Sequence, residues 1–165
     1  MAKDFSFDVV SKVDMTVVSE CVQVALKEIG NRFDFRGTDS KIEFDQKAQV
    51  IKLQSADEYK VKAVLDVLQM RMAKRNLPLK NFTPEKVEEA LGGTAKMILK
   101  IVDGIPGDKG KNIVKDLKKS GLKVQASIQK DQLRVTSRAK DTLQEAIKYL
   151  KKQDYDVSLQ FENYR

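Results

Sequence analysis

Two stretches of this sequence share one pattern: IKLQSADEYKVKAVLDVL at residues 51–68 and LRVTSRAKDTLQEAIKYL at residues 133–150. In each stretch, two alternating apolar residues lead to a serine, at Ser55 and Ser137, as expected at the end of a strand. Apolar residues at helical spacing then follow in both. The sequence therefore predicts two copies of one strand–helix unit.

The segments before residues 51–68 extend the first copy. Residues 5–9 alternate like a strand, Asp14 is placed to cap a helix that Gly30 ends, and residues 42–53 read as a hairpin. Ser55 and Glu58 have the spacing of a capping box for the second helix. The apolar faces of the two helices are Val18, Cys21, Val22, Ala25 and Ile29, and Val61, Val64, Leu65, Leu68 and Met72.

The same order returns after the flexible pair Gly92-Gly93, with strands, helices and a hairpin that ends in a strand at residues 155–161. A strand–helix–strand–strand–helix–strand unit closes most simply as a ferredoxin-like fold. We therefore expect an α+β protein of two tandem ferredoxin-like (βαββαβ) repeats with antiparallel sheets. The expected domains are residues 1–92 and 93–165.

Composition removes several classes of function. The chain contains no histidine, so catalytic triads and histidine metal sites are excluded, and we expect no catalytic residues, metal site or cofactor. Cys21 is the only cysteine and falls on an apolar helix face, which predicts a packed thiol. Without a signal peptide or a long apolar run, the expected location is the cytoplasm, with no membrane contact.

Charge is distributed unevenly along the chain. Residues 1–92 hold 15 Lys and Arg against 15 Asp and Glu, whereas residues 93–165 hold 16 against 9. Such asymmetry indicates an anionic partner for the basic part, although a merely solvated lysine surface gives the same pattern. Six lysines gather within fifteen residues as the main candidates for phosphate binding: Lys109, Lys111, Lys115, Lys118, Lys119 and Lys123.

The segment Gly107-Asp108-Lys109-Gly110 resembles the GXXG loop of KH domains, in which the backbone approaches phosphates. A turn that simply starts a helix needs no ligand, and this is the interpretation that we favour. The outward residues of the second hairpin include no aromatic ring, which argues against base recognition by stacking on that sheet.

The stretch NRFDFRG at residues 31–37 alternates charged and aromatic residues. If it is extended, Phe33 and Phe35 point to one face and Arg32 and Arg36 to the other. We expect the two rings in the core. In the functional alternative, Arg32 and Arg36 grip a phosphate, and a stacking platform is the third possibility.

Four stretches together resemble the YajQ family of bacterial nucleotide-binding proteins, from residue 5 to residue 165. They are FSFDVVSKVD (5–14), NRFDFRG (31–37), LKVQASIQKDQLRVTSRAKDTLQEAI (122–147) and LQFENYR (159–165). The resemblance implies tandem ferredoxin-like repeats that exchange their first strands, so that residues 5–10 complete the second sheet and residues 96–102 the first. It also implies non-enzymatic binding of nucleotides or RNA, with cyclic dinucleotides as ligands of some members.

The matching motifs also contain Arg134 and Arg138. With them, the candidate phosphate-binding residues are Arg32, Arg36, Lys109, Lys111, Lys115, Lys118, Lys119, Lys123, Arg134 and Arg138.

Three other functions stay open. A regulatory protein would sense a small nucleotide, such as a cyclic dinucleotide, and act through a protein partner. An enzyme hydrolysing phosphoryl or acyl phosphate bonds would use Arg36 beside Asn31 or Asn112. A structural adaptor would bind no ligand at all.

Overall fold

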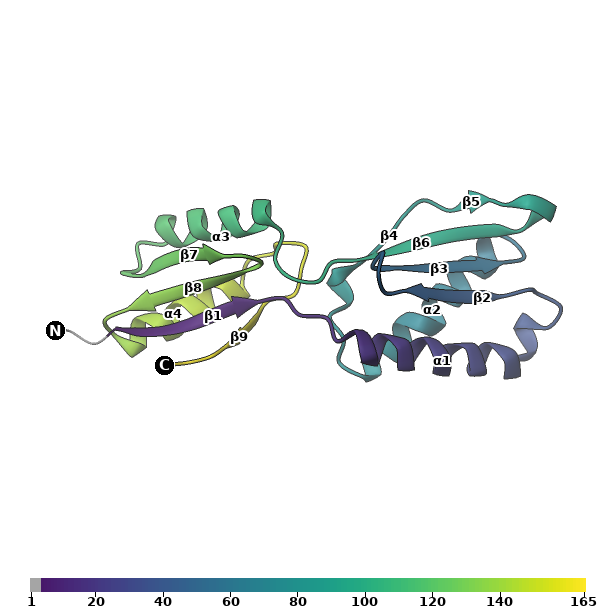
Figure 1. The fold of residues 1–165 in the computed structure, drawn as a ribbon, viewed down its shortest axis with the longest axis horizontal. Helices are drawn as coiled ribbons and strands as arrows, with labels where there is room; N and C mark the ends of the chain where they lie inside the picture. Colours follow the sequence, from purple (N-terminus) through teal and green to yellow (C-terminus); the bar gives the residue numbers. More distant parts are fainter. Residues whose placement is uncertain (1–3) are drawn as a thin grey trace. The chain divides into compact units, whose positions relative to one another are not determined.

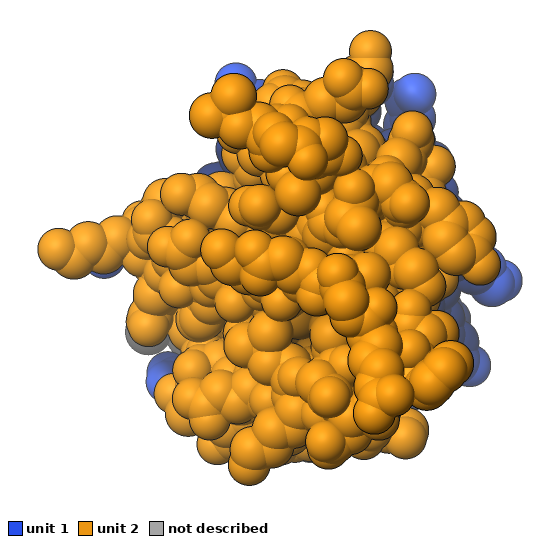
Figure 2. All heavy atoms as spheres, turned by 90° about the vertical axis from the view of Figure 1, so that its right-hand side faces the viewer, with its two compact units in different colours: residues 1–12, 103–165 blue, residues 13–102 orange. Residues whose placement is uncertain are grey.

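The computed structural model describes residues 4–165, which form two compact units (Figures 1 and 2). Unit 1 contains residues 4–12 and Asp103–Arg165, and unit 2 contains Val13–Val102. No helix in the described part of the chain is long and apolar enough to cross a membrane.

Unit 2 is a four-stranded antiparallel sheet with a short added strand and two helices, in the order β2-β3-β6-β4 with β5 beside β6 (Figure 1). Its elements are α1 (Met15–Asn31), the 3₁₀ helix η1 (Phe33–Phe35), β2 (Lys41–Asp45), β3 (Val50–Ser55), α2 (Glu58–Lys74), η2 (Leu79–Asn81), β4 (Phe82–Pro84), β5 (Glu88–Glu89), η3 (Leu91–Gly93) and β6 (Ala95–Ile101).

Unit 1 is a four-stranded antiparallel sheet in the order β7-β8-β1-β9, with two helices. Its elements are β1 (Phe5–Val10), α3 (Gly107–Lys119), β7 (Gln125–Gln129), β8 (Gln132–Ser137), α4 (Lys140–Lys151) and β9 (Gln160–Glu162). The last strand is shorter than predicted, because Tyr155 and Val157 are buried in the segment that leads to it rather than in the strand.

The two ferredoxin-like repeats do not each keep their own first strand. β1 pairs with β8 and β9, while β6 pairs with β3 and β4, which is the pairing that a strand exchange requires. The spatial units therefore differ from the expected domains 1–92 and 93–165. Residues 93–102 belong to unit 2, in which Ala95–Ile101 form β6 of the sheet, and β1 belongs to the sheet of unit 1.

This exchange also changes the charge of each part. Unit 1, from residue 4 onward, holds 15 Lys and Arg against 11 Asp and Glu, and unit 2 holds 15 against 13. The expected net charges were zero for residues 1–92 and +7 for residues 93–165. The net charges of the units are closer to each other, at +4 for unit 1 from residue 4 onward and +2 for unit 2. Net charge alone does not locate a site, so the arrangement of individual cations must do so.

The helix starts follow from local hydrogen bonds. Asp14 caps α1, as predicted, by accepting from the Thr16 backbone N–H at 3.0 Å. The capping box expected at Ser55 is wrong, because Asp57 caps α2 through Lys60 N–H at 2.8 Å. Ser55 instead ends β3, and its hydroxyl hydrogen-bonds to the Ser40 hydroxyl at 2.8 Å.

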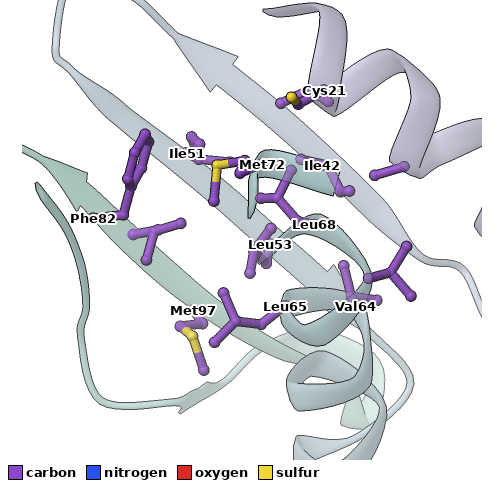
Figure 3. Packing of buried hydrophobic residues seen from close by; sticks show 14 of the residues in the cluster. Cys21, Ile42, Ile51, Leu53, Val64, Leu65, Leu68, Met72, Phe82 and Met97 are labelled. Atoms are coloured by element: carbon purple, nitrogen blue, oxygen red, sulfur yellow. The ribbon is translucent and has the colours of Figure 1, made fainter. Parts of the chain in front are cut away.

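The core of unit 2 lies between the sheet and its two helices (Figure 3). The predicted apolar faces of α1 and α2 are buried there, including Leu68 and Met72, which pack over Ile51 and Leu53 of β3. Cys21 is part of this core, and burial raises the pKa of its thiol. The thiol is thus a packing group, as expected.

Candidate functional site

Helix α3 presents a row of lysines to solvent. Its buried side contains Gly110, Ile113 and Leu117. The exposed lysines recur at intervals of three and four residues, which places them on one helix face. This α3 lysine row consists of Lys111, Lys115, Lys118 and Lys119.

The α3 lysine row is not neutralised within the protein. None of the ion pairs formed within residues 4–165 involves its members. Asp116, which lies among them in sequence, accepts a 2.7 Å hydrogen bond from the Tyr155 hydroxyl. Lys109 differs, because its ammonium pairs with Asp156 at 3.1 Å. The lysine cluster expected from the sequence therefore divides into the paired Lys109, the α3 lysine row and Lys123, which lies beyond the helix.

A pocket of about 470 Å³ lies where β8 leads into α4, and two cations line it. Lys123 precedes β7, and Arg138 precedes α4; both are exposed and neither forms an ion pair within the described chain. Other lining residues are Asp4, Val124, Gln125, Thr136, Ser137, Ala139 and Thr142. The structure thus brings together two of the predicted phosphate-binding residues.

The start of α4 also lines this pocket, through Ala139 and Thr142. Ala139 occupies the cap position, and no side chain caps the helix. The first N–H groups of a helix carry partial positive charge and suit an anion. Thr142 lies in this first turn and lines the pocket. The sequence did not predict the uncapped helix start at Ala139 or the position of Thr142 in the pocket, because Lys140 and Asp141 resemble any ordinary helix start.

A second, smaller pocket of about 280 Å³ lies beside the first, next to α3. It is lined by Lys118 of α3 and shares Val124 and Gln125 with the larger pocket. Both pockets adjoin β7, the outermost strand on its side of the sheet. We call Lys118, Lys123 and Arg138 the β7-edge site. Three cations that make no ion pair within residues 4–165 thus follow one sheet edge.

Arg134 lies on the same sheet but has an internal partner. Its Nε donates to the Asp8 carboxylate at 3.0 Å, and Asn163 donates to the same carboxylate at 2.8 Å. Burial raises the pKa of Asp8, but these hydrogen bonds and the charges of Arg134 and Arg165 outweigh that effect, so the pKa lies below its ordinary value. Arg134 is therefore less available to a phosphate than Lys123 or Arg138.

The NRFDFRG stretch is not extended. Phe33–Phe35 form a 3₁₀ turn, so the expectation that both rings are buried is wrong. Phe35 is 4% exposed, whereas Phe33 is 82% exposed. A 3₁₀ helix rotates by about 120° per residue, which sends residues two apart to different sides. A strand would have placed both rings on one face.

The two arginines of this stretch also differ. Arg32 makes two hydrogen bonds to Asp34, at 3.0 and 2.8 Å. Arg36 makes no ion pair within residues 4–165, and its guanidinium lies 5.5 Å from the centre of the Phe33 ring. A shared phosphate grip by both arginines would require Arg32 to leave Asp34.

The glycine-rich segment starts α3. Gly107 and Gly110 lie in the first turn of this helix, with Pro106 at the cap position. A Cβ added at Gly110 would lie 3.5 Å from the Ile128 side chain, which indicates helix-to-strand packing. The segment thus starts a helix, and the interpretation that it needs no ligand stays a prediction.

Residues 4–165 contain no group of three or more cysteine, aspartate or glutamate side chains arranged to hold a metal ion.

Comparison with known proteins shows similarity along nearly the whole chain. A family model described as "Nucleotide-binding protein YajQ-like" matches residues 5–165. A nucleotide-binding protein of Elusimicrobium minutum is 54% identical over 162 residues, covering 98% of this chain and 99% of the relative. Nucleotide-binding proteins of Koribacter versatilis, with 98% of each chain covered, and Carboxydothermus hydrogenoformans, with 100% covered, are 49% and 45% identical.

Proposed function

Because the chain belongs to the YajQ-like family of nucleotide-binding proteins, we propose that it binds nucleotides or RNA through their phosphates, without catalysis, at the β7-edge site. The observation that carries this proposal is the pocket of about 470 Å³ lined by Lys123 and Arg138. Neither of these cations forms an ion pair with a carboxylate within residues 4–165. Cations without internal partners are free to form charge-assisted hydrogen bonds with phosphate oxygens.

The surroundings of the site suit a chain of phosphates. Lys118 connects the pocket to the α3 lysine row, so cations continue from the start of α4 along the exposed face of α3. Successive phosphates of a single strand can contact such a row one after another. The polar residues Gln125 and Thr136 face the same pocket and can hydrogen-bond to ribose hydroxyls.

A second candidate ligand is a cyclic dinucleotide, which a regulatory protein would sense and report to a protein partner. The size of the larger pocket favours this candidate, since about 470 Å³ falls within the range of small-molecule sites. Such a ligand would occupy the pocket of Lys123 and Arg138 without reaching along the α3 lysine row.

The test is binding of two fluorescent probes, a single-stranded RNA of about ten nucleotides and a cyclic dinucleotide, measured by anisotropy. One variant combines Lys118→Glu, Lys123→Glu and Arg138→Glu. The matched control reverses three exposed lysines of unit 2, as Lys27→Glu, Lys47→Glu and Lys86→Glu.

We expect the β7-edge variant to lose RNA binding while the control retains it. The same loss for the cyclic dinucleotide would assign that ligand to the pocket. Equal binding by wild type and the β7-edge variant would overturn the proposed site. A wild-type protein that binds neither probe would overturn the proposed function itself.

A further inference from the structure

The Phe33 ring of unit 2 lies outside the core. It is 82% exposed, whereas Phe35, two residues later, supplies the buried anchor of the same turn. A single exposed apolar side chain is common on protein surfaces, so the groups beside the ring must decide whether it marks a contact site.

The turn that carries Phe33 is held from several sides. The backbone N–H of Arg36 donates to the Phe33 carbonyl at 3.1 Å, and the N–H of Phe35 donates to the Arg32 carbonyl at 3.2 Å. Lys60 of α2 donates to the Asp34 carbonyl, and the ion pair of Arg32 with Asp34 spans the turn. A ligand that meets the ring therefore has little backbone to order, which favours binding.

Arg36 supplies a cation beside the ring. Its guanidinium lies 5.5 Å from the centre of the Phe33 ring, within the range of a cation–π interaction. It also lines a cavity of about 310 Å³ together with Gly37 and Thr38. Arg36, which forms no ion pair within residues 4–165, thus lies beside an exposed ring and also lines a hollow.

We propose that Phe33 and Arg36 form a stacking site for the base of a nucleotide, with Arg36 also contacting its phosphate. A base can stack on an aromatic ring or on a guanidinium plane, and a nucleotide brings the anion that Arg36 lacks. An apolar protein surface packed on Phe33 would instead bury the Arg36 charge without a counter-ion, which is costly. This inference rests on the proposed function and assigns to unit 2 a base-binding site of its own, separate from the phosphate contacts proposed for unit 1.

The experiment separates base contacts from phosphate contacts by using two labelled probes of equal charge. One is a pentamer of adenylate RNA, and the other is the same ribose–phosphate chain without bases. A labelled mononucleotide, AMP, distinguishes a site for free nucleotides from one for strands. Binding is measured by fluorescence anisotropy at constant salt.

The variants are Phe33→Leu, which keeps an apolar side chain without a ring, and Phe33→Tyr, which keeps the ring. The matched control is Leu91→Ala, another exposed apolar side chain of unit 2, 98% exposed. Thermal unfolding should be the same for all of them, because neither position is buried.

We expect Phe33→Leu to bind the RNA pentamer about tenfold more weakly, the usual effect of removing one stacked base, and to bind the abasic chain as wild type does. Phe33→Tyr should restore pentamer binding. Weaker AMP binding in Phe33→Leu would show that the site accepts free nucleotides, and unchanged AMP binding together with the pentamer loss would show that it requires a strand.

Equal pentamer affinity in wild type and Phe33→Leu would overturn the stacking site alone. An equal loss for both pentamers would overturn it too, because the ring would then not act through the base. Wild-type protein that binds none of the probes would refute the stacking site together with the proposed function.

Discussion

The salt dependence of RNA binding should report how many cations contact phosphates. The α3 lysine row together with Lys123 and Arg138 gives six cations that form no ion pair within residues 4–165. For a single strand, each phosphate contact contributes about −0.7 to the slope of log K against log salt, so six contacts give about −4.2. Affinity should then fall about 300-fold between about 50 and 200 mM salt.

The informative perturbation removes three of these charges without reversing them, as Lys118→Gln, Lys123→Gln and Arg138→Gln. The slope should fall by about half, to about −2.1, so that the same change in salt weakens binding only about 20-fold. Anisotropy titrations with labelled single-stranded RNA across this salt range measure both slopes. A control variant neutralises Lys27, Lys47 and Lys86 of unit 2 in the same way.

Two outcomes would refute this reasoning. An unchanged slope of log K against log salt in the triple glutamine variant would mean that Lys118, Lys123 and Arg138 do not contact phosphates. An equal decrease in the control would mean that the slope reports total charge rather than a site, because long-range attraction depends on net charge and not on individual contacts.

Three further predictions concern stability and the folding unit. Asp8→Asn should lower the free energy of unfolding at pH 7 by about 1–3 kcal/mol, because Arg134 loses its charged partner. The pKa of Asp8 is lowered on folding, so the contribution of its carboxylate to the free energy of unfolding is present above about pH 4 and is lost as the pH falls further. The urea unfolding curves of the variant and the wild type should therefore converge at low pH. Curves that stay apart at low pH would exclude the ion pair as the cause. Gly110→Ala should raise stability by about 0.5–1 kcal/mol and leave RNA binding unchanged, since the added methyl meets ordinary contacts in a helix; lost binding in a stably folded variant would indicate a phosphate-binding glycine loop. Fragments 1–92 and 93–165 should each lack a cooperative thermal transition by circular dichroism, because each is missing an inner strand of its sheet; an intact transition in either would contradict the strand pairing.

The elements that could be predicted from the sequence are those that local pattern determines. Alternation marks the hairpin strands, and the apolar spacing of α1 and α2 identifies their buried faces, because burial on one face leaves a period in the sequence. NRFDFRG was misread for the same reason. Alternation over a few residues fits a strand, and the sequence pattern alone does not distinguish it from a 3₁₀ turn, in which Lys60 of α2, distant in sequence, donates to the Asp34 carbonyl.

The candidate site could be predicted in part. Lysine density indicated α3, and the motif positions included Lys123 and Arg138, all of which the structure places around β7. Sequence did not show which cations are already paired. Lys109 is held by Asp156, and Arg134 by a residue more than a hundred positions away, so charge counting assigned them the same availability as the free lysines.

The strand exchange explains why counting charge along the chain was misleading. A sheet is defined by its ladder of backbone hydrogen bonds, and a short alternating pattern such as that of β1 does not show which of two similar sheets receives it as an inner strand. Because β1 pairs with β8 and β6 pairs with β3, residues on opposite sides of the expected domain boundary at residues 92 and 93 lie in the same unit. Asp8 then lies opposite Arg134 and neutralises it, whereas Lys123 and Arg138 form no ion pair within residues 4–165. The exchange thus determines which positive charges remain for a ligand, and a site based on phosphate binding depends on that pairing as much as on the lysines themselves.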